Sequence, residues 1–169
     1  MDKCLAVSLL ATATAVVAQT PAERITAKAD RLELDQLTGV QQLTGNVLIT
    51  QGDISIEGDN IKVATRNGAI SRIFGSGNPI KFQQMLANGE VVTTESSEID
   101  YLTSSWTLVF RGNVVLQRSE WQLGGHVVEY NIRNRNFSAR GTDSNANSDT
   151  GSVAAGNSSR VSITYHRGQ

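Results

Sequence analysis

Two clusters of carboxylates are the first candidates for chemistry in this chain of 169 residues. They lie at Asp53, Glu57 and Asp59, and at Glu95, Glu98 and Asp100. Two carboxyl groups on either side of a sugar ring are what a glycosidase uses. Most of these residues alternate with apolar positions or lie at expected bends, which predicts that they point to solvent. A carbohydrate-active enzyme of the β-solenoid type stays an alternative, but we expect no enzyme.

Other reactive groups are sparse. His126 is expected at an exposed bend, and His166 lies near the end of the chain. No HExxH, GxSxG or CxxC pattern is present, and Gly75-Ser76-Gly77 lacks the strand and helix of a phosphate loop. The formal net charge is -1 and no basic patch is interleaved with aromatic residues, which argues against nucleic-acid binding. We predict no catalytic residue, no metal site and no cofactor.

The elements that would position any site are strands. Around Gly45-Asn46-Val47 the apolar residues form pairs two positions apart, and each pair follows the last at the same interval: Val47 and Ile49, Ile54 and Ile56, Ile61 and Val63. Side chains two apart share one face of a strand. A helical seam would need spacings of three and four. We therefore predict short strands, with bends at Gly52 and Gly58.

The same pattern returns without a gap at Gly112-Asn113-Val114, and Ile25 and Ala27 align with Val92 and Thr94. Such an internal repeat predicts a repetitive β architecture of on the order of fifteen short strands. Asn67-Gly68 and Asn88-Gly89 are hairpin signals, and the segment 75–79 is expected to be a loop or bulge. A sandwich, a closed barrel and a coiled two-layer jelly roll all fit. Open edges of such a stack are either capped or used for assembly by strand addition.

The expected inward face is apolar along its whole length. It is formed by Ile25, Leu32, Ile49, Ile54, Ile56, Phe82, Tyr101, Phe110, Leu116, Trp121 and Leu123. These residues form either an ordinary dry core or, if the coil does not fully close, a trough that would suit acyl chains.

The chain divides into three parts. Residues 1–18 have the features of a secretory signal peptide, with Lys3, an apolar run and Val16-Val17-Ala18 at the cleavage site. A buried N-terminal helix is the alternative, and the run is short for a membrane span. After cleavage the chain would have no cysteine, so it would need no disulfides in an oxidising compartment. Residues 19–140 form the expected β domain. Residues 141–169 form a Gly-, Ser- and Asn-rich tail that we expect to be flexible, although Val161 to Tyr165 could form an extra strand.

The signal peptide, the doubled repeat and the tail together resemble the OstA-like (LptA-type) family of periplasmic lipopolysaccharide-transport proteins. The matching residues extend from about Ile25 to Ala139. They are Ile25 to Asp30, Gly45-Asn46-Val47 to Gln51-Gly52, Ile61-Lys62-Val63, Gly75 to Pro79, Phe82, Gln84-Met85, Asn88-Gly89, Tyr101 and Gly112-Asn113-Val114.

The resemblance implies an all-β fold, a twisted and incompletely closed β-jelly roll of many short antiparallel strands. It implies a non-enzymatic bridge in the periplasm that binds the lipid A part of lipopolysaccharide and carries it from inner to outer membrane. Ile25, Ala27, Phe82 and Tyr101 would face the lipid. An LptC-like inner-membrane protein would pair at the N-terminal edge, near Ile25 to Leu34. The next copy in a head-to-tail oligomer, or an LptD-like outer-membrane protein, would pair near Val127 to Ala139. A strand-addition module that binds no lipid stays an alternative.

Overall fold

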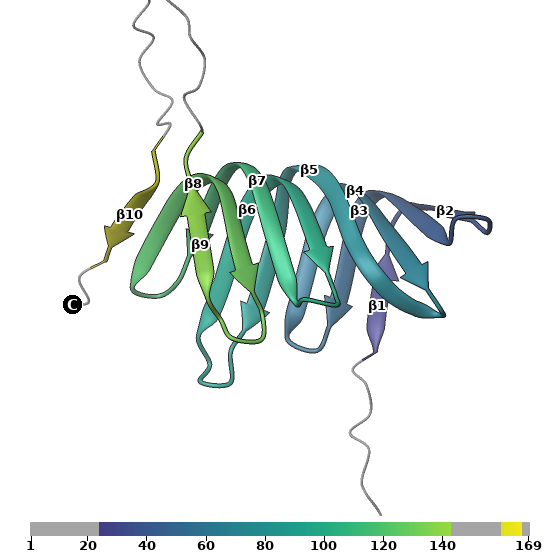
Figure 1. Ribbon diagram of the computed structural model, residues 1–169, viewed down its shortest axis with the longest axis horizontal. Helices are drawn as coiled ribbons and strands as arrows, with labels where there is room; N and C mark the ends of the chain where they lie inside the picture. The colour runs from purple at the N-terminus through teal and green to yellow at the C-terminus, as the bar shows by residue number, and fades with distance from the viewer. Residues whose placement is uncertain (1–23, 143–159, 167–169) are drawn as a thin grey trace, which may run out of the picture.

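A computed structural model shows a single antiparallel β-sheet of ten strands (Figure 1) and describes residues 24–142 and 160–166. The expected signal peptide, residues 1–18, and most of the expected tail lie outside the described residues. The strands are β1 (Ile25–Lys28), β2 (Arg31–Asp35), β3 (Val40–Gln51), β4 (Ile54–Arg66), β5 (Ala69–Met85), β6 (Val91–Leu102), β7 (Thr107–Gln117), β8 (Trp121–Asn131), β9 (Phe137–Arg140) and β10 (Ser162–Tyr165).

Strands β3 to β8 follow one another in chain order, each paired with the next. At one end of the sheet, β1 and β2 both pair with β3, and at the other end β9 and β10 both pair with β8. Figure 1 shows the two pairs of short strands at opposite ends of the molecule. The sheet is not closed, as the expected jelly roll requires.

Bulges fold the sheet into two layers. The register shifts between Thr44 and Val47 in β3, and between Arg111 and Val114 in β7. Gly45, Asn46, Gly112 and Asn113 all have positive φ there, which glycine and asparagine tolerate best. The repeated Gly-Asn-Val motif therefore encodes the bend itself. Further register shifts in β4, β5 and β6 lie beside these bulges, and the sheet bends along all of them. This bend is the arch along the top of Figure 1.

The side opposite this arch, which we call the mouth, is bordered by two rows of turns. One row comprises the turns at 52–53, 86–90 and 118–120, and the other those at 67–68, 103–106 and 132–136. We name the layers after these rows: the first layer holds the half-strands that end at the first row, and the second layer holds the others. Apolar side chains from both layers meet between them and form one buried cluster.

The structure corrects the predicted number and length of the strands. Instead of about fifteen short strands, ten are described, and β5 alone extends from Ala69 to Met85. Gly58 lies inside β4 at a bulge and not at a chain reversal, because a bulge bends a strand without ending it. The turns expected at Gly52, Asn67-Gly68 and Asn88-Gly89 are confirmed, as is the bulge within 75–79.

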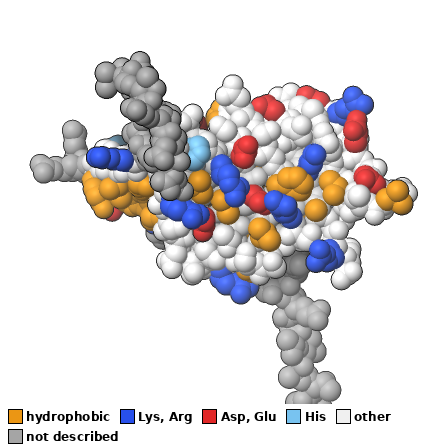
Figure 2. Space-filling model, turned by 45° about the horizontal axis from the view of Figure 1, so that its top comes forward, with side chains coloured by type: hydrophobic (Ala, Val, Ile, Leu, Met, Phe, Trp, Pro, Cys, Tyr) orange, Lys and Arg blue, Asp and Glu red, His pale blue; other side chains and the backbone are white. Residues whose placement is uncertain are grey.

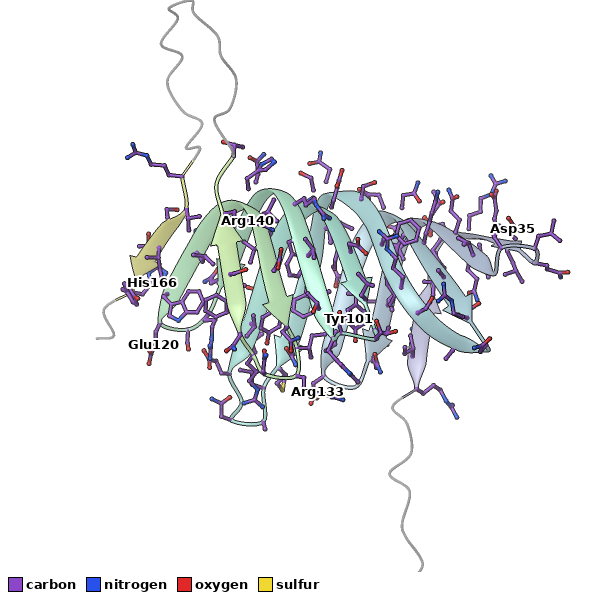
Figure 3. All side chains as sticks on the ribbon, in the orientation of Figure 1. Asp35, Tyr101, Glu120, Arg133, Arg140 and His166 are labelled. Atoms are coloured by element: carbon purple, nitrogen blue, oxygen red, sulfur yellow. The ribbon has the colours of Figure 1, made fainter. Side chains whose placement is uncertain are left out.

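The extra strand that the alternation at Val161 to Tyr165 allows is present. Residues Ser162–Tyr165 form β10, which pairs antiparallel with residues 121–124 of β8. A backbone hydrogen bond from His166 to Glu120 extends this pairing, and Figure 3 shows the two residues next to each other beside β10. The β domain therefore includes a strand from beyond the predicted boundary at residue 140.

Candidate functional site

One row of inward-facing positions crosses the first layer from end to end. The pairing registers join Ala27 to Ile49, Ile49 to Ile56, Ile56 to Phe82, Phe82 to Thr94, Thr94 to Leu116, Leu116 to Leu123 and Leu123 to Ile163. Most of these side chains are buried. The pairing registers thus place six of the predicted site residues side by side in one apolar row along the long axis of the molecule.

The second layer presents two similar rows. One contains Leu32, Leu43, Ile61, Ile99, Phe110 and Val128, and the other contains Leu34, Val63, Ile73, Tyr101, Leu108 and Tyr130. Phe82 of the first layer reaches the second, where its ring centroid lies 5.5 Å from that of Phe110 and 6.1 Å from that of Tyr130. These distances are those of favourable aromatic pairs, so the layers are packed against each other.

The interior is filled in this structure. Phe82 is 1 % exposed and Tyr101 is 4 % exposed. A residual cavity of about 10 Å³ is lined by residues of both layers, among them Ile25, Ile54 and Ile132. That is about the space of a single water molecule. Of the two alternatives that the sequence left open, a filled core or an open trough, the structure shows the filled core.

Polar and aromatic contacts join the two layers near the mouth. The Tyr130 hydroxyl donates a hydrogen bond to Gln84 Oε1 at 2.8 Å, and the Trp121 and Phe137 rings lie 4.9 Å apart. Burial raises the pKa of both the Tyr101 and the Tyr130 phenol. The Tyr130 phenol therefore stays a hydrogen-bond donor at neutral pH and holds the layers together without charge.

Two of the predicted site residues are not inside. Leu32 is 59 % exposed and Ala27 is exposed, because β1 and β2 form the edge of the sheet and no further strand covers them. Leu32 lies in an inward-facing row of the second layer, as predicted, but in the single chain no strand covers it. Ile25, Ile54 and Trp121 are half-buried around the core, and the other seven residues are buried: Ile49, Ile56, Phe82, Tyr101, Phe110, Leu116 and Leu123.

Three residues at the interface of the two layers are not among the predicted site residues. Thr94 lies in the middle of the first-layer row, 1 % exposed, and its Oγ1 has no hydrogen-bond partner among the described residues. The repeat alignment with Ala27 was the available signal for its inward position. Gln84 and Tyr130 meet only after the sheet folds over, so no local pattern could pair them.

The carboxylates of the two acidic clusters point outward, as predicted. Five of them are exposed, and Asp100 is half-buried against Arg72 with a 2.7 Å hydrogen bond. Glu57 and Glu95 line one outer hollow of about 300 Å³, with Lys81 paired between them. Both side chains are exposed, as expected for charges on a solvated surface. Within residues 24–142 and 160–166, no three His, Cys, Asp or Glu side chains gather as metal ligands.

The turn at 118–120 is fixed by a partly buried ion pair between Arg118 and Glu90. The hydrogen bond from Arg118 lowers the pKa of Glu90 below its usual range. Because the Glu90 carboxyl has a lower pKa in the folded chain than in the unfolded chain, its ionised form stabilises the fold at pH values above the unfolded-state pKa of about 4.3. This stabilisation is lost as the pH falls through the folded-state pKa. We expect Glu90→Gln to cost about 1–2 kcal/mol at neutral pH, and the difference from wild type to shrink below about pH 4.

Urea unfolding of both proteins between neutral and acidic pH measures this effect. The control is Glu33→Gln, because Glu33 pairs with Arg31 on the open surface at 2.8 Å. That exposed pair is expected to contribute less than about 0.5 kcal/mol. Equal losses in the two variants, or a Glu90→Gln loss that is the same at pH 3 and pH 7, would contradict the assignment.

The fold and its interior define a class: an open, folded-over β-sheet whose two layers enclose a continuous apolar face. The family model described as LptA/(LptD N-terminal domain) LPS transport protein matches residues 26–136. The chain belongs to this family.

Individual relatives agree with the family. The chain is 33% identical over 144 residues to the lipopolysaccharide export system protein LptA of Escherichia coli (strain K12), covering 82% of this chain and 77% of that protein. It is 28% identical over 116 residues to LptA of Haemophilus influenzae, covering 67% of each. A solved structure of LptH, the LptA-homologous periplasmic component of the lipopolysaccharide transport device of Pseudomonas aeruginosa, superimposes with a TM-score of 0.72 at 19% identity. It covers 86% of this chain and 96% of that one. The LptH structure supports the jelly-roll fold.

The described residues, 24–142 and 160–166, contain no helix and therefore none that could cross a membrane.

Proposed function

We propose that this chain binds the lipid part of lipopolysaccharide between its two layers and carries it through the periplasm as one unit of a protein bridge. The observation that supports this most directly is the apolar row that crosses the first layer from Ala27 to Ile163. A row that reaches both edges of an open sheet can continue into a neighbouring unit. Each methylene group buried along it contributes about 0.8 kcal/mol.

Acyl chains would enter by parting the layers at the mouth. The interior has room for little more than a water molecule, so lipid must displace side chains or separate the layers. The cross-layer bond between Tyr130 and Gln84 is the polar contact that such a separation would break. Side chains that leave the core would be replaced by acyl chains of similar polarity, which keeps the cost of opening low.

The ends of the sheet would join partners. The N-terminal edge, β1 and β2, would receive an LptC-like partner of the inner membrane. The C-terminal edge, formed by β9 and β10 over β8, would receive the next copy or an LptD-like partner of the outer membrane. Unpaired backbone groups on these short strands would allow pairing by strand addition. The protein would act without enzymatic chemistry, and its signal peptide would direct it to the periplasm.

A second candidate is a strand-addition module that binds no lipid. The packed, nearly cavity-free interior favours this candidate, because a filled core needs no ligand. The two functions differ in one property, namely whether lipid reaches the interior.

A photo-crosslinking side chain at residue 82, in place of Phe82, tests lipid binding. Its matched control is residue 83, in place of Gln83, which is the next residue on the same strand and points outward. With lipopolysaccharide present we expect a clear adduct at position 82 and only background at position 83. Equal labelling at both positions, or none at 82, would favour the module that binds no lipid. Tyr101 and the exposed Leu102 form a second pair of the same kind.

A further inference from the structure

One hydroxyl is buried among the apolar side chains between the layers without a partner. Thr94 is 1% exposed, and its neighbours in the pairing register, Phe82 and Leu116, are both buried. Within residues 24–142 and 160–166, the Thr94 Oγ1 is the one buried side-chain oxygen or nitrogen that has no hydrogen-bond partner. Charged side chains of both signs lie instead on the outer surface, where water solvates them (Figure 2). A buried hydroxyl without a partner destabilises a fold and therefore calls for a physical explanation.

Other hydroxyls of the fold show what Thr94 lacks. The Ser96 hydroxyl donates a hydrogen bond to the Glu98 carbonyl oxygen at 2.9 Å, and the Thr103 hydroxyl donates one to the Ile70 carbonyl oxygen, also at 2.9 Å. These contacts form at a bulge and beside a turn. Thr94 lies in a regular stretch of β6 with a paired strand on each side, and these strands take up the backbone carbonyls.

The architecture does not require a hydroxyl at this position. Ala27 occupies the equivalent place in the first copy of the repeat, and it pairs with Ile49 as Thr94 pairs with Leu116. Valine has nearly the shape of threonine, suits a strand as well and has no polar atom to leave unpaired. Thr94 also does not line the residual interior cavity, so a water molecule in that cavity would not serve its hydroxyl. The hydroxyl is therefore available to a group that enters from outside.

A second polar side chain lies diagonal to Thr94 on the same face. Gln84 of β5 pairs with Val92, two residues before Thr94, so the Gln84 and Thr94 Cα atoms are about 7–8 Å apart. In the closed fold the Gln84 Oε1 accepts the hydrogen bond of the Tyr130 hydroxyl from the other layer. Parting of the layers would remove Tyr130 and leave the Gln84 amide facing the space between them. Opening therefore presents two neighbouring hydrogen-bonding groups on a mostly apolar face.

We propose that the Thr94 hydroxyl recognises the linkage of the acyl chain: it donates a hydrogen bond to the carbonyl oxygen of the ester or amide that joins the chain to its headgroup, with the Gln84 amide beside the same linkage. This inference rests on the proposed function and adds which chemical group of the lipid is recognised. An acyl chain carries such a carbonyl at one end only, and the rest of the chain is methylene groups that suit the apolar row.

The place of Thr94 in β6 sets the depth of the bound linkage. β6 begins at Val91 beside the mouth, and Thr94 lies about 10 Å further along the strand at about 3.4 Å per residue. The headgroup then lies on the side of the mouth and the chain on the side of the arch. Since the Thr94 hydroxyl is already out of water in the closed fold, the new hydrogen bond forms without further desolvation of this group. An ether-linked alkyl chain would fill the same space but leave the hydroxyl unpaired.

Two substitutions separate the hydroxyl from the shape of the side chain. Thr94→Val keeps the shape and removes the hydroxyl, whereas Thr94→Ser keeps the hydroxyl and removes a methyl group. We expect the midpoint of thermal unfolding to rise by about 2–4 °C in Thr94→Val and to fall in Thr94→Ser. A lower midpoint in Thr94→Val would mean that the hydroxyl has a partner in the folded chain and would overturn the proposal.

Matched probes test the recognition of the carbonyl. The lauroyl ester and the dodecyl ether of glucose differ mainly in this group. Each is added to the full-length protein below its micelle-forming concentration, in competition with lipopolysaccharide for the photo-adduct at position 101. We expect the preference for the ester over the ether to be about 3–10-fold smaller in Thr94→Val than in wild type, the contribution of one neutral hydrogen bond. Thr94→Ser is expected to keep the wild-type preference.

Infrared spectroscopy of the bound ester gives a readout that a purely structural role of Thr94 would not change. The stretching band of an isotopically labelled ester carbonyl is expected at lower wavenumber on wild type than on Thr94→Val, because a hydrogen bond weakens the carbonyl bond. An unchanged band, or an unchanged preference in Thr94→Val, would overturn the role of Thr94 and leave lipid binding intact. If wild type bound neither probe and formed no lipopolysaccharide adduct, the proposed function would fail, and this recognition with it.

Discussion

Replacing Phe110 with alanine is expected to lower the free energy of unfolding of the ligand-free protein by about 3–5 kcal/mol. Phe110 is fully buried in the second layer, between Ile99 and Val128 in the pairing register. Its ring meets Phe82 of the first layer at 5.5 Å. The substitution would leave a cavity where the two layers touch, and the loss of both transfer energy and contacts explains the size of the effect.

Urea unfolding measures this loss, with Phe74→Ala as the control. Phe74 lies on the same sheet but faces outward, half-buried, with the Arg72 guanidinium 4.6 Å from its ring centroid. Its removal should cost about 1 kcal/mol, mostly the lost cation–π contact and some burial. Similar losses at the two positions would mean that the layers are not packed against each other in solution.

The sequence predicted the elements of this fold more reliably than their assembly. Alternation around Val47 and Ile49 is a local property, and it correctly gave the inward face of β3. The Gly-Asn pairs at 45–46 and 112–113 marked the two copies of the repeat, but the sequence did not show that their positive φ values form the bulges. The repeat at Gly112 likewise predicted the inward face of β7, where Val114 and Leu116 are buried.

What the sequence could not provide depends on long-range pairing. A bulge and a turn have the same local signals, so Gly58 was expected to end a strand that in fact continues as β4. Leu32 has the pattern of a core residue, and its exposure follows only from the position of β2 at the edge. Alternation at Val161 to Tyr165 allowed an extra strand, but its pairing partner, residues 121–124 of β8, lies far away in the chain and could not be predicted from a local pattern. Local patterns therefore predict which side chains of a strand face inward. Which strands lie at the edge of the sheet depends on the pairing of all the strands.

The second large effect is expected at Gly75, where alanine should destabilise the fold by on the order of 3 kcal/mol or more. Gly75 lies in β5 opposite Ile61, close to the bulge that bends β4. A Cβ at this position would lie 2.3 Å from the Asn60 carbonyl oxygen and 2.8 Å from the Ile61 Cα. Both atoms belong to the backbone of a paired strand, so neither can move without shifting the register on which both layers depend.

Gly68→Ala separates this clash from the general cost of replacing a glycine. Gly68 has a φ of 76° in the hairpin turn between β4 and β5, and a Cβ there would meet nothing within 4 Å. Its replacement should cost about 1–2 kcal/mol, the price of a left-handed conformation alone. Gly75 has no positive φ, so any excess at that position arises from the approach of the two strands. If Gly75→Ala were as stable as Gly68→Ala, the bend in β4 would have to yield easily. A bend that deforms so easily would also let the layers part for a lipid without breaking the pairing between strands. This comparison therefore also measures how stiff the bend between the two layers is.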